Sequence, residues 1–126
     1  MIKQAIIPLA GLGTRLIPLT TVIPKELLPI NGKPNLEYIM EECLDAGIKE
    51  FIFIISKNKS SIKKYFFNDA FYKKIIKKKK DKRIVEEFKK IKKYQKMIKF
   101  VYQNKPKGTG DAVLKCRRYI KDKFFL

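Results

Sequence analysis

The residues best suited to chemistry lie in one glycine-bearing segment near the start of the sequence. Gly11 and Gly13 are followed directly by Thr14 and Arg15, and Lys25 comes shortly after them. Backbone N–H groups of a glycine loop can approach a phosphate closely, and nearby Arg and Lys side chains supply the charge that a plain turn does not need. A dinucleotide fingerprint would need a third glycine where this sequence has leucine, and a Walker loop would need Gly-Lys-Ser/Thr. The pattern therefore indicates a phosphate-binding loop of neither type.

The composition excludes several classes of site. The sequence has no histidine, so His bases, Ser-His triads and His-ligated metal centres are ruled out. Its two cysteines, Cys43 and Cys116, are far apart and fall on apolar helix faces, so we expect reduced core thiols in a cytoplasmic protein. The longest apolar run, 51–55, is far too short to span a bilayer, and no membrane partner is expected.

The net charge of +18 raises a nucleic-acid-binding module as an alternative of another class. Only four of the 30 basic residues are arginine. Proteins that read nucleic acid favour arginine, because its planar side chain matches bases and phosphates. The charge is therefore weak evidence for nucleic acid, and we expect the basic stretch 73–93 to be a solvated helix face with Ile84, Phe88 and Ile91 buried.

The loops must be positioned by elements in which strand and helix alternate. We expect one domain, 1–126, of the α/β class, with a Rossmann-like, doubly wound and mainly parallel sheet. The expected elements are a strand over 4–9, a proline-rich loop to about 34, a helix over 36–44 ended by Gly47, a strand over 51–55, a helix to 67, a lysine-studded helix over 69–94 broken near 81, a strand over 97–102, a helix over 110–120 and a strand starting at 124. Ligands of such sheets bind at the carboxyl ends of the strands, where the loops 10–15 and 103–110 follow.

Three motifs resemble the signature of the sugar-1-phosphate nucleotidyltransferases. They are Leu-Ala-Gly-Leu-Gly-Thr-Arg at 9–15, Pro-Lys-Glu-Leu-Leu-Pro at 24–29 and Lys-Pro at 33–34. Within that superfamily the sequence is most similar to the N-terminal portion of the bacterial UTP–glucose-1-phosphate uridylyltransferases. The resemblance implies transfer of uridylyl from UTP to glucose 1-phosphate, giving UDP-glucose and pyrophosphate. The alternative enzymes are a thymidylyltransferase and an N-acetylglucosamine-1-phosphate uridylyltransferase.

The resemblance also implies roles for individual residues. Arg15 and Lys25 are the expected catalytic residues, Lys25 neutralising the α-phosphate. The remaining expected nucleotide contacts are Leu9, Ala10 and Gly11 around the base, Gly13 and Thr14 around the β,γ-phosphates, Glu26 in support, and Gln103 and Gly108 at the uracil edge. A sugar phosphate is already anionic, so the reaction needs no general base, and positioning and cations carry it.

Two features depart from the resemblance. Position 111 is usually His in this family and is Asp here, which we interpret as a helix-capping residue. The family's Mg²⁺ ligand follows the next strand, so we expect it beyond Leu126, and no metal ligand within this sequence. We accordingly expect a truncated chain that is inactive alone, and a full-length enzyme that is a homo-oligomer.

Overall fold

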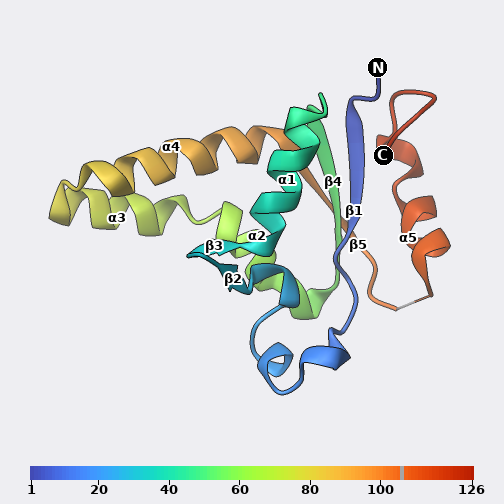
Figure 1. Ribbon diagram of the computed structural model, residues 1–126, viewed down its shortest axis with the longest axis horizontal. Coiled ribbons are helices and arrows are strands. Elements are labelled where there is room, and N and C mark those ends of the chain that lie inside the picture. Colours follow the sequence, from blue (N-terminus) through green and yellow to red (C-terminus); the bar gives the residue numbers. More distant parts are fainter. Residues whose placement is uncertain (106) are drawn as a thin grey trace.

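The core of the protein is a parallel three-stranded sheet (Figure 1). The computed structural model describes residues 1–105 and 107–126. The strands β1 (Gln4–Pro8), β4 (Glu50–Ile55) and β5 (Ile98–Tyr102) lie in the order β1-β4-β5. Phe53 at the middle of β4 is in register with Ile7 on one side and Phe100 on the other. The predicted parallel α/β fold is thus confirmed.

The central strand β4 is buried on both faces, because alternate side chains point to opposite sides of a strand. Phe51, Phe53 and Ile55 belong to one apolar cluster, and Ile52 and Ile54 belong to a second. All five are fully buried. The sheet therefore separates two hydrophobic cores, one under each layer of helices.

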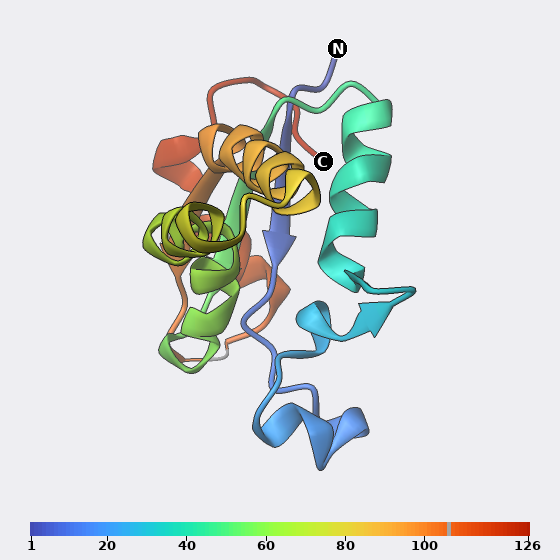
Figure 2. The ribbon, with the colours of Figure 1, turned by 90° about the vertical axis from the view of Figure 1, so that its left-hand side faces the viewer.

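Helices cover both faces of the sheet, as the doubly wound prediction requires. Figures 1 and 2 show α1, α2 and the end of α4 on one face and α5 on the other. The larger core receives Leu36 and Met40 of α1, Phe66 of α2 and Ile91 of α4. The bounds are α1 (Asn35–Asp45), α2 (Ser60–Phe66), α3 (Asp69–Lys79), α4 (Lys82–Met97) and α5 (Thr109–Lys115).

The last residue pairs with the free edge of β1. Leu126 donates its N–H to the Gln4 carbonyl at 2.9 Å, and its own carbonyl accepts from the N–H of Ile6 at 2.9 Å. One residue bonded to two residues that flank a third is the parallel pattern. The expectation of a strand near 124 that lies beside the first strand is consistent with this pairing, although no strand is assigned there.

The proline-rich stretch contains a small hairpin that the sequence prediction left as loop. Strands β2 (Pro29–Ile30) and β3 (Lys33–Pro34) pair antiparallel. Asn31 and Gly32 between them both have positive φ, 51° and 76°. The Asn-Gly pair is a strong signal for a two-residue hairpin turn, and it was present in the sequence.

The lysine-rich segment is two helices that project away from the sheet (Figure 1). Lys80 ends α3 in the left-handed conformation, and the Asp81 side chain caps α4 by accepting from the N–H of Arg83 at 2.8 Å. Of the three residues expected to be buried, only Ile91 is; Ile84 and Phe88 are half-buried. The expectation was wrong for those two because they lie where the helix pair has left the sheet.

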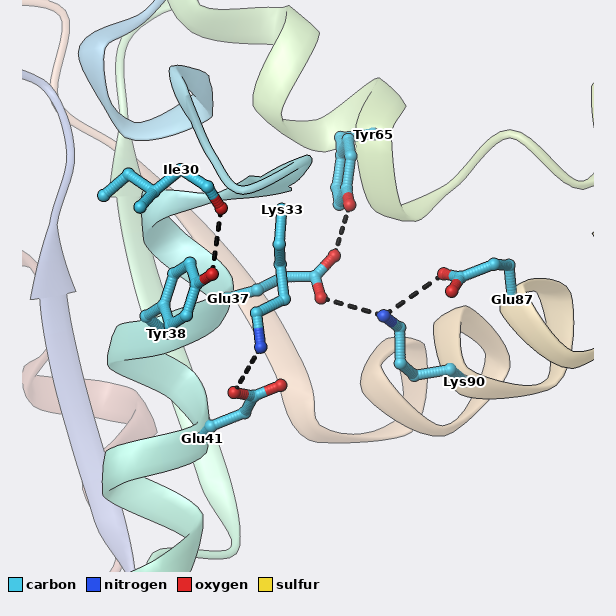
Figure 3. Close-up of polar contacts among 8 residues, drawn as sticks. All are labelled: Ile30, Lys33, Glu37, Tyr38, Glu41, Tyr65, Glu87 and Lys90. Carbon is cyan, nitrogen blue, oxygen red and sulfur yellow. Dashed lines mark hydrogen bonds and ion pairs between the residues drawn. The ribbon is translucent and has the colours of Figure 1, made fainter.

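A buried carboxylate joins three of these helices. Figure 3 shows Glu37 of α1 between Tyr65 of α2 and Lys90 of α4. The Tyr65 hydroxyl donates to Glu37, and the Lys90 Nζ lies 3.1 Å from the second Glu37 oxygen and 3.1 Å from Glu87. Burial and the neighbouring Glu37 carboxylate raise the pKa of Tyr65. The contact fixes the helix pair to the body of the protein.

Both cysteines are buried and unbridged, as expected. Burial raises the pKa of the Cys43 and Cys116 thiols.

The C-terminal helix is shorter than predicted: α5 ends at Lys115, and a separate short turn, Arg117–Tyr119, follows it. Within the described ranges, no helix has the length and apolar character needed to cross a membrane.

Candidate functional site

The predicted loops meet at the carboxyl ends of the strands. In Figures 1 and 2 the segment after β1 lies at the end of the sheet opposite the chain termini. The segment after β5 leads to the start of α5 at the same end of the sheet. β1 pairs with β4 along one edge and with Leu126 along the other. The sheet therefore extends in both directions from β1, and the loop after β1 begins where these two directions divide. Ligands of open α/β sheets bind at such a position.

A first hollow of about 270 Å³ brings together six of the predicted residues. Ala10 and Gly11 come from the loop after β1, and Gln103 and Gly108 come from the loop after β5. Lys25 and Glu26 also line it. Residues nearly 100 positions apart in the sequence thus form one site. We name it the base hollow.

A second hollow of about 560 Å³ is lined by Gly13, Thr14, Arg15, Leu16 and Lys25. It contains the residues that the resemblance assigns to the phosphates. We name it the phosphate hollow. Lys25 lines both hollows, so its position is where the base end and the phosphate end of a bound nucleotide would meet.

Glycine is required at position 13 by the backbone. Its φ is +65°, and a Cβ there would lie only 3.0 Å from Thr20 Cγ2. The Thr20 hydroxyl donates to the Gly13 carbonyl at 2.7 Å and holds this turn in place. Among the residues with described positions, the N–H groups of Gly11 and Gly13 donate to no backbone oxygen. These donors are therefore available to an anion.

Arg15 and Lys25 are exposed cations. In the described part of the chain, no carboxylate oxygen lies within 4.0 Å of either one. Their charge is therefore not cancelled by an ion pair and is available to phosphates.

Glu26, next to Lys25, is buried and paired elsewhere. Both of its oxygens accept from Lys59 Nζ, at 2.9 and 3.0 Å, and the two side chains are only 6% and 8% exposed. Glu26 is therefore not an exposed surface acid. Lys59 also lines a third hollow of about 370 Å³, with Gly11 and Lys25. The sequence analysis missed Lys59, because a lysine within a lysine-rich stretch gives no signal of its own.

Gln103 is buried, and its side chain is bound to Asp111. Its Nε2 donates to Asp111 Oδ2 at 2.9 Å and to the Gly108 carbonyl at 3.3 Å. The interpretation of Asp111 as a helix cap is wrong, since Gly108 occupies the cap position of α5 and no side chain caps that helix. The nearest cation to Asp111 is Lys115, at 4.0 Å.

Leu9 differs from the other predicted residues. Its side chain is buried in the larger core, and its N–H donates to the Ile54 carbonyl at 2.7 Å. A contact from Leu9 to a nucleotide would therefore have to come from its carbonyl.

The expected Mg²⁺ has no ligand set in the described residues. Within 1–105 and 107–126, no three Asp, Glu, Cys or His side chains gather in a way that could hold a metal ion. The two acids nearest the site, Glu26 and Asp111, are bound to Lys59 and Gln103. The residues present therefore do not fit the ion. The expectation of a ligand beyond residue 126 stays a prediction.

Comparison with known proteins identifies the family. The sequence pattern of the Nucleotidyl transferase family matches residues 4–74, which include β1, the glycine loop and the Lys25 segment. The chain belongs to this family.

Curated relatives of this chain carry the name UTP–glucose-1-phosphate uridylyltransferase. The one from Bacillus subtilis (strain 168) is 39% identical over 98% of this chain, and the one from Escherichia coli (strain K12) is 36% identical over 96%. The chain spans 42% and 40% of the length of these two relatives. It therefore aligns with less than half of each.

Solved structures agree with the sequence relatives. A UTP-bound UGPase from Acinetobacter baumannii superposes with a TM-score of 0.80 at 31% identity, covering 99% of this chain and 44% of that chain. A UDP-glucose pyrophosphorylase complexed with UDP-glucose superposes with a TM-score of 0.69 at 33% identity, covering 95% and 42%. The predicted fold and family resemblance are confirmed, and the roles of the individual site residues stay predictions.

Proposed function

We propose that the chain is the nucleotide-binding part of a UTP–glucose-1-phosphate uridylyltransferase. In this reaction a phosphate oxygen of glucose 1-phosphate forms a bond to the α-phosphorus of UTP. The bond from that phosphorus to the oxygen bridging the α- and β-phosphates breaks, and pyrophosphate leaves with its electron pair. The products are UDP-glucose and pyrophosphate. Because the chain spans under half of its curated relatives, the complete activity and both substrates are part of the proposal.

The observation that carries the proposal is the place of Lys25 between the two hollows. The base hollow presents a buried amide and backbone groups, and the phosphate hollow presents Arg15 and backbone N–H groups. A nucleoside triphosphate has this same order, a neutral base at one end and anionic phosphates at the other. The α-phosphate of the nucleotide lies between the base and the remaining phosphates, and Lys25 has the corresponding position between the two hollows.

The residue roles follow from this orientation. Ala10, Gly11, Gln103 and Gly108 contact the base, with Leu9 contributing its carbonyl. Gly13, Thr14 and Arg15 bind the phosphates that leave, and Lys25 neutralises the charge that develops at the α-phosphate. Glu26 supports the loop through Lys59 and does not contact the nucleotide through a free carboxylate. Mg²⁺, a cytoplasmic location and a homo-oligomeric enzyme are further expectations of the resemblance.

The experiment measures UTP binding by calorimetry to the wild-type chain, to Lys25→Ala and to Lys49→Ala. Lys49 is an exposed lysine immediately before β4, at the opposite end of the sheet from the loops, and is the matched control. We expect Lys25→Ala to weaken UTP binding at least about tenfold, the loss of one charge-assisted contact. Both variants should unfold at nearly the wild-type temperature, because exposed lysines contribute little stability. Equal UTP affinity in all three proteins would contradict the assignment of Lys25.

A further inference from the structure

The hydrogen bond between the buried Gln103 and the half-buried Asp111 points to a determinant of base selectivity. We propose that Asp111 positions the Gln103 side chain so that its carbonyl oxygen, and not its amine, faces the base hollow, and that the site thereby selects uracil over cytosine. The inference rests on the proposed function, because it takes the ligand to be a pyrimidine nucleotide.

The hydrogen-bond network decides which way the amide of Gln103 points. Its two neighbours on one side are the Asp111 carboxylate at 2.9 Å and the Gly108 carbonyl at 3.3 Å. Both are acceptors only, so they can be satisfied by the NH₂ group and not by the amide oxygen. The two hydrogens of Nε2 are used by these two partners, and Oε1 is directed away from them.

The rest of Gln103 is also fixed. The residue is 6% exposed, and its backbone N–H donates to the Ile55 carbonyl at 2.9 Å. Its side chain lines the base hollow together with Ala10 and Gly11. Across the described residues, no group donates to Oε1. The hollow therefore contains an acceptor held in one orientation and ready for a donor from the ligand.

The two common pyrimidines differ at the atom that such an acceptor reads. Uracil carries an N–H at N3 between two carbonyls, whereas cytosine has a lone pair at N3 and places its donor on the exocyclic amine. A fixed Oε1 accepts from N3–H of uracil. Against cytosine in the same pose it would set two lone pairs against each other, because the amide cannot rotate without breaking its bonds to Asp111 and Gly108.

A carboxylate suits this positioning role because it has no hydrogen to offer. At position 111 the resemblance leads one to expect histidine, whose ring has one donor nitrogen and one acceptor nitrogen and can bind either end of an amide. Asp111 can accept only, so it enforces a single orientation of Gln103. Its contact at 4.0 Å with Lys115, one turn later on α5, keeps the charge paired.

The test compares Asp111→Ala, Asp111→Asn and Gln103→Ala with the wild-type chain. Alanine removes the acceptor. Asparagine removes the charge, including its favourable effect in the first turn of α5. It keeps an oxygen that can accept from Gln103 and adds an NH₂ group that can donate to Oε1. Dissociation constants for UTP and for CTP are measured by calorimetry, and the Gln103 side-chain amide protons of the ¹⁵N-labelled, ligand-free chain are followed by NMR.

We expect the ratio of CTP to UTP dissociation constants to fall about tenfold in Asp111→Ala and in Gln103→Ala, the effect of one hydrogen bond. In Asp111→Asn the ratio should fall by an intermediate amount, because asparagine can bind either end of the Gln103 amide. The amide protons of Gln103 should shift and exchange faster in Asp111→Ala than in the wild type, and Asp111→Asn should lie between the two. Uracil selectivity that Asp111→Ala retains would overturn the positioning role and leave the proposed function standing. A wild-type chain that binds neither nucleotide would overturn both.

Discussion

The buried pair Glu26–Lys59 allows a quantitative prediction about stability. Both oxygens of Glu26 lie within 3.0 Å of Lys59 Nζ, and neither side chain is more than 8% exposed. Replacing Lys59 by methionine keeps an unbranched side chain that is one atom shorter and removes the charge. Glu26 then remains buried with no counter-ion, which costs about 3–5 kcal/mol. Domains of this size have total stabilities of about 5–15 kcal/mol, so the variant loses a large part of its stability.

The assay is urea unfolding of the wild type, Lys59→Met, Glu26→Leu and the double variant. Replacing both partners removes the buried charge, so the double variant should recover most of the loss seen in either single variant. The control is Lys89→Met, which breaks the pair between Lys89 and Glu86 on the surface of α4, where the side chains are 66% and 70% exposed. It should cost less than about 1 kcal/mol. A loss in Lys59→Met no larger than in this control would refute the buried-charge argument.

Two further predictions concern pH and the basic helix. Hydrogen bonds from Lys121 and Lys92, the largest cause in each case, lower the pKa of Glu50 and of Asp69. A carboxyl group whose pKa is lowered in the folded state stabilises the fold at pH values above its unfolded pKa, which is near 4. This stabilisation is lost as the pH falls through the folded pKa. The urea midpoint should therefore fall between about pH 5 and pH 3, and it should fall less in the double variant Glu50→Gln/Asp69→Asn. Reversing the four exposed lysines at 73, 74, 77 and 78 to Glu should leave UTP affinity within about twofold of wild type by calorimetry, because α3 projects away from the sheet and from the loop that follows β1 (Figure 1). A selective loss of UTP binding would mean that this face belongs to the site.

Periodicity was sufficient to predict the elements that build the core. Runs of apolar residues identify the strands, and the apolar stripe at helical spacing identifies α1. Both patterns follow from backbone geometry alone. The same patterns misjudged Ile84 and Phe88, which have the spacing of a buried face. Local spacing indicates which side of a helix is apolar, but not how far the helix extends beyond the sheet that would cover it.

The residue types of the site were predictable, but the partners of its two acidic residues were not. Glu26 and Lys59 are 33 residues apart, and only the folded chain brings them together. Gln103 and Asp111 are closer in sequence, yet their contact depends on Gly108. This residue immediately precedes α5, and its φ of +89° lies in the left-handed region. Helix-capping preference gave Asp111 a local role, whereas the tertiary contact with a buried amide determines its position.

These contacts account for the charge that the site presents. A triphosphate needs cations whose charge is not cancelled, yet Glu26 is adjacent to Lys25 in sequence, and Asp111 binds Gln103, which lines the base hollow. Lys59 holds Glu26 inside the protein, and Gln103 and Lys115 bind Asp111 in the first turn of α5. With both acids engaged, the positive charges of Arg15 and Lys25 remain directed at the phosphate hollow. Under the proposed function, the affinity for phosphate depends on residues that do not contact it. Lys59→Met should therefore weaken UTP binding even where the chain remains folded, because the buried Glu26, which lines the base hollow together with Lys25, then carries an uncompensated negative charge.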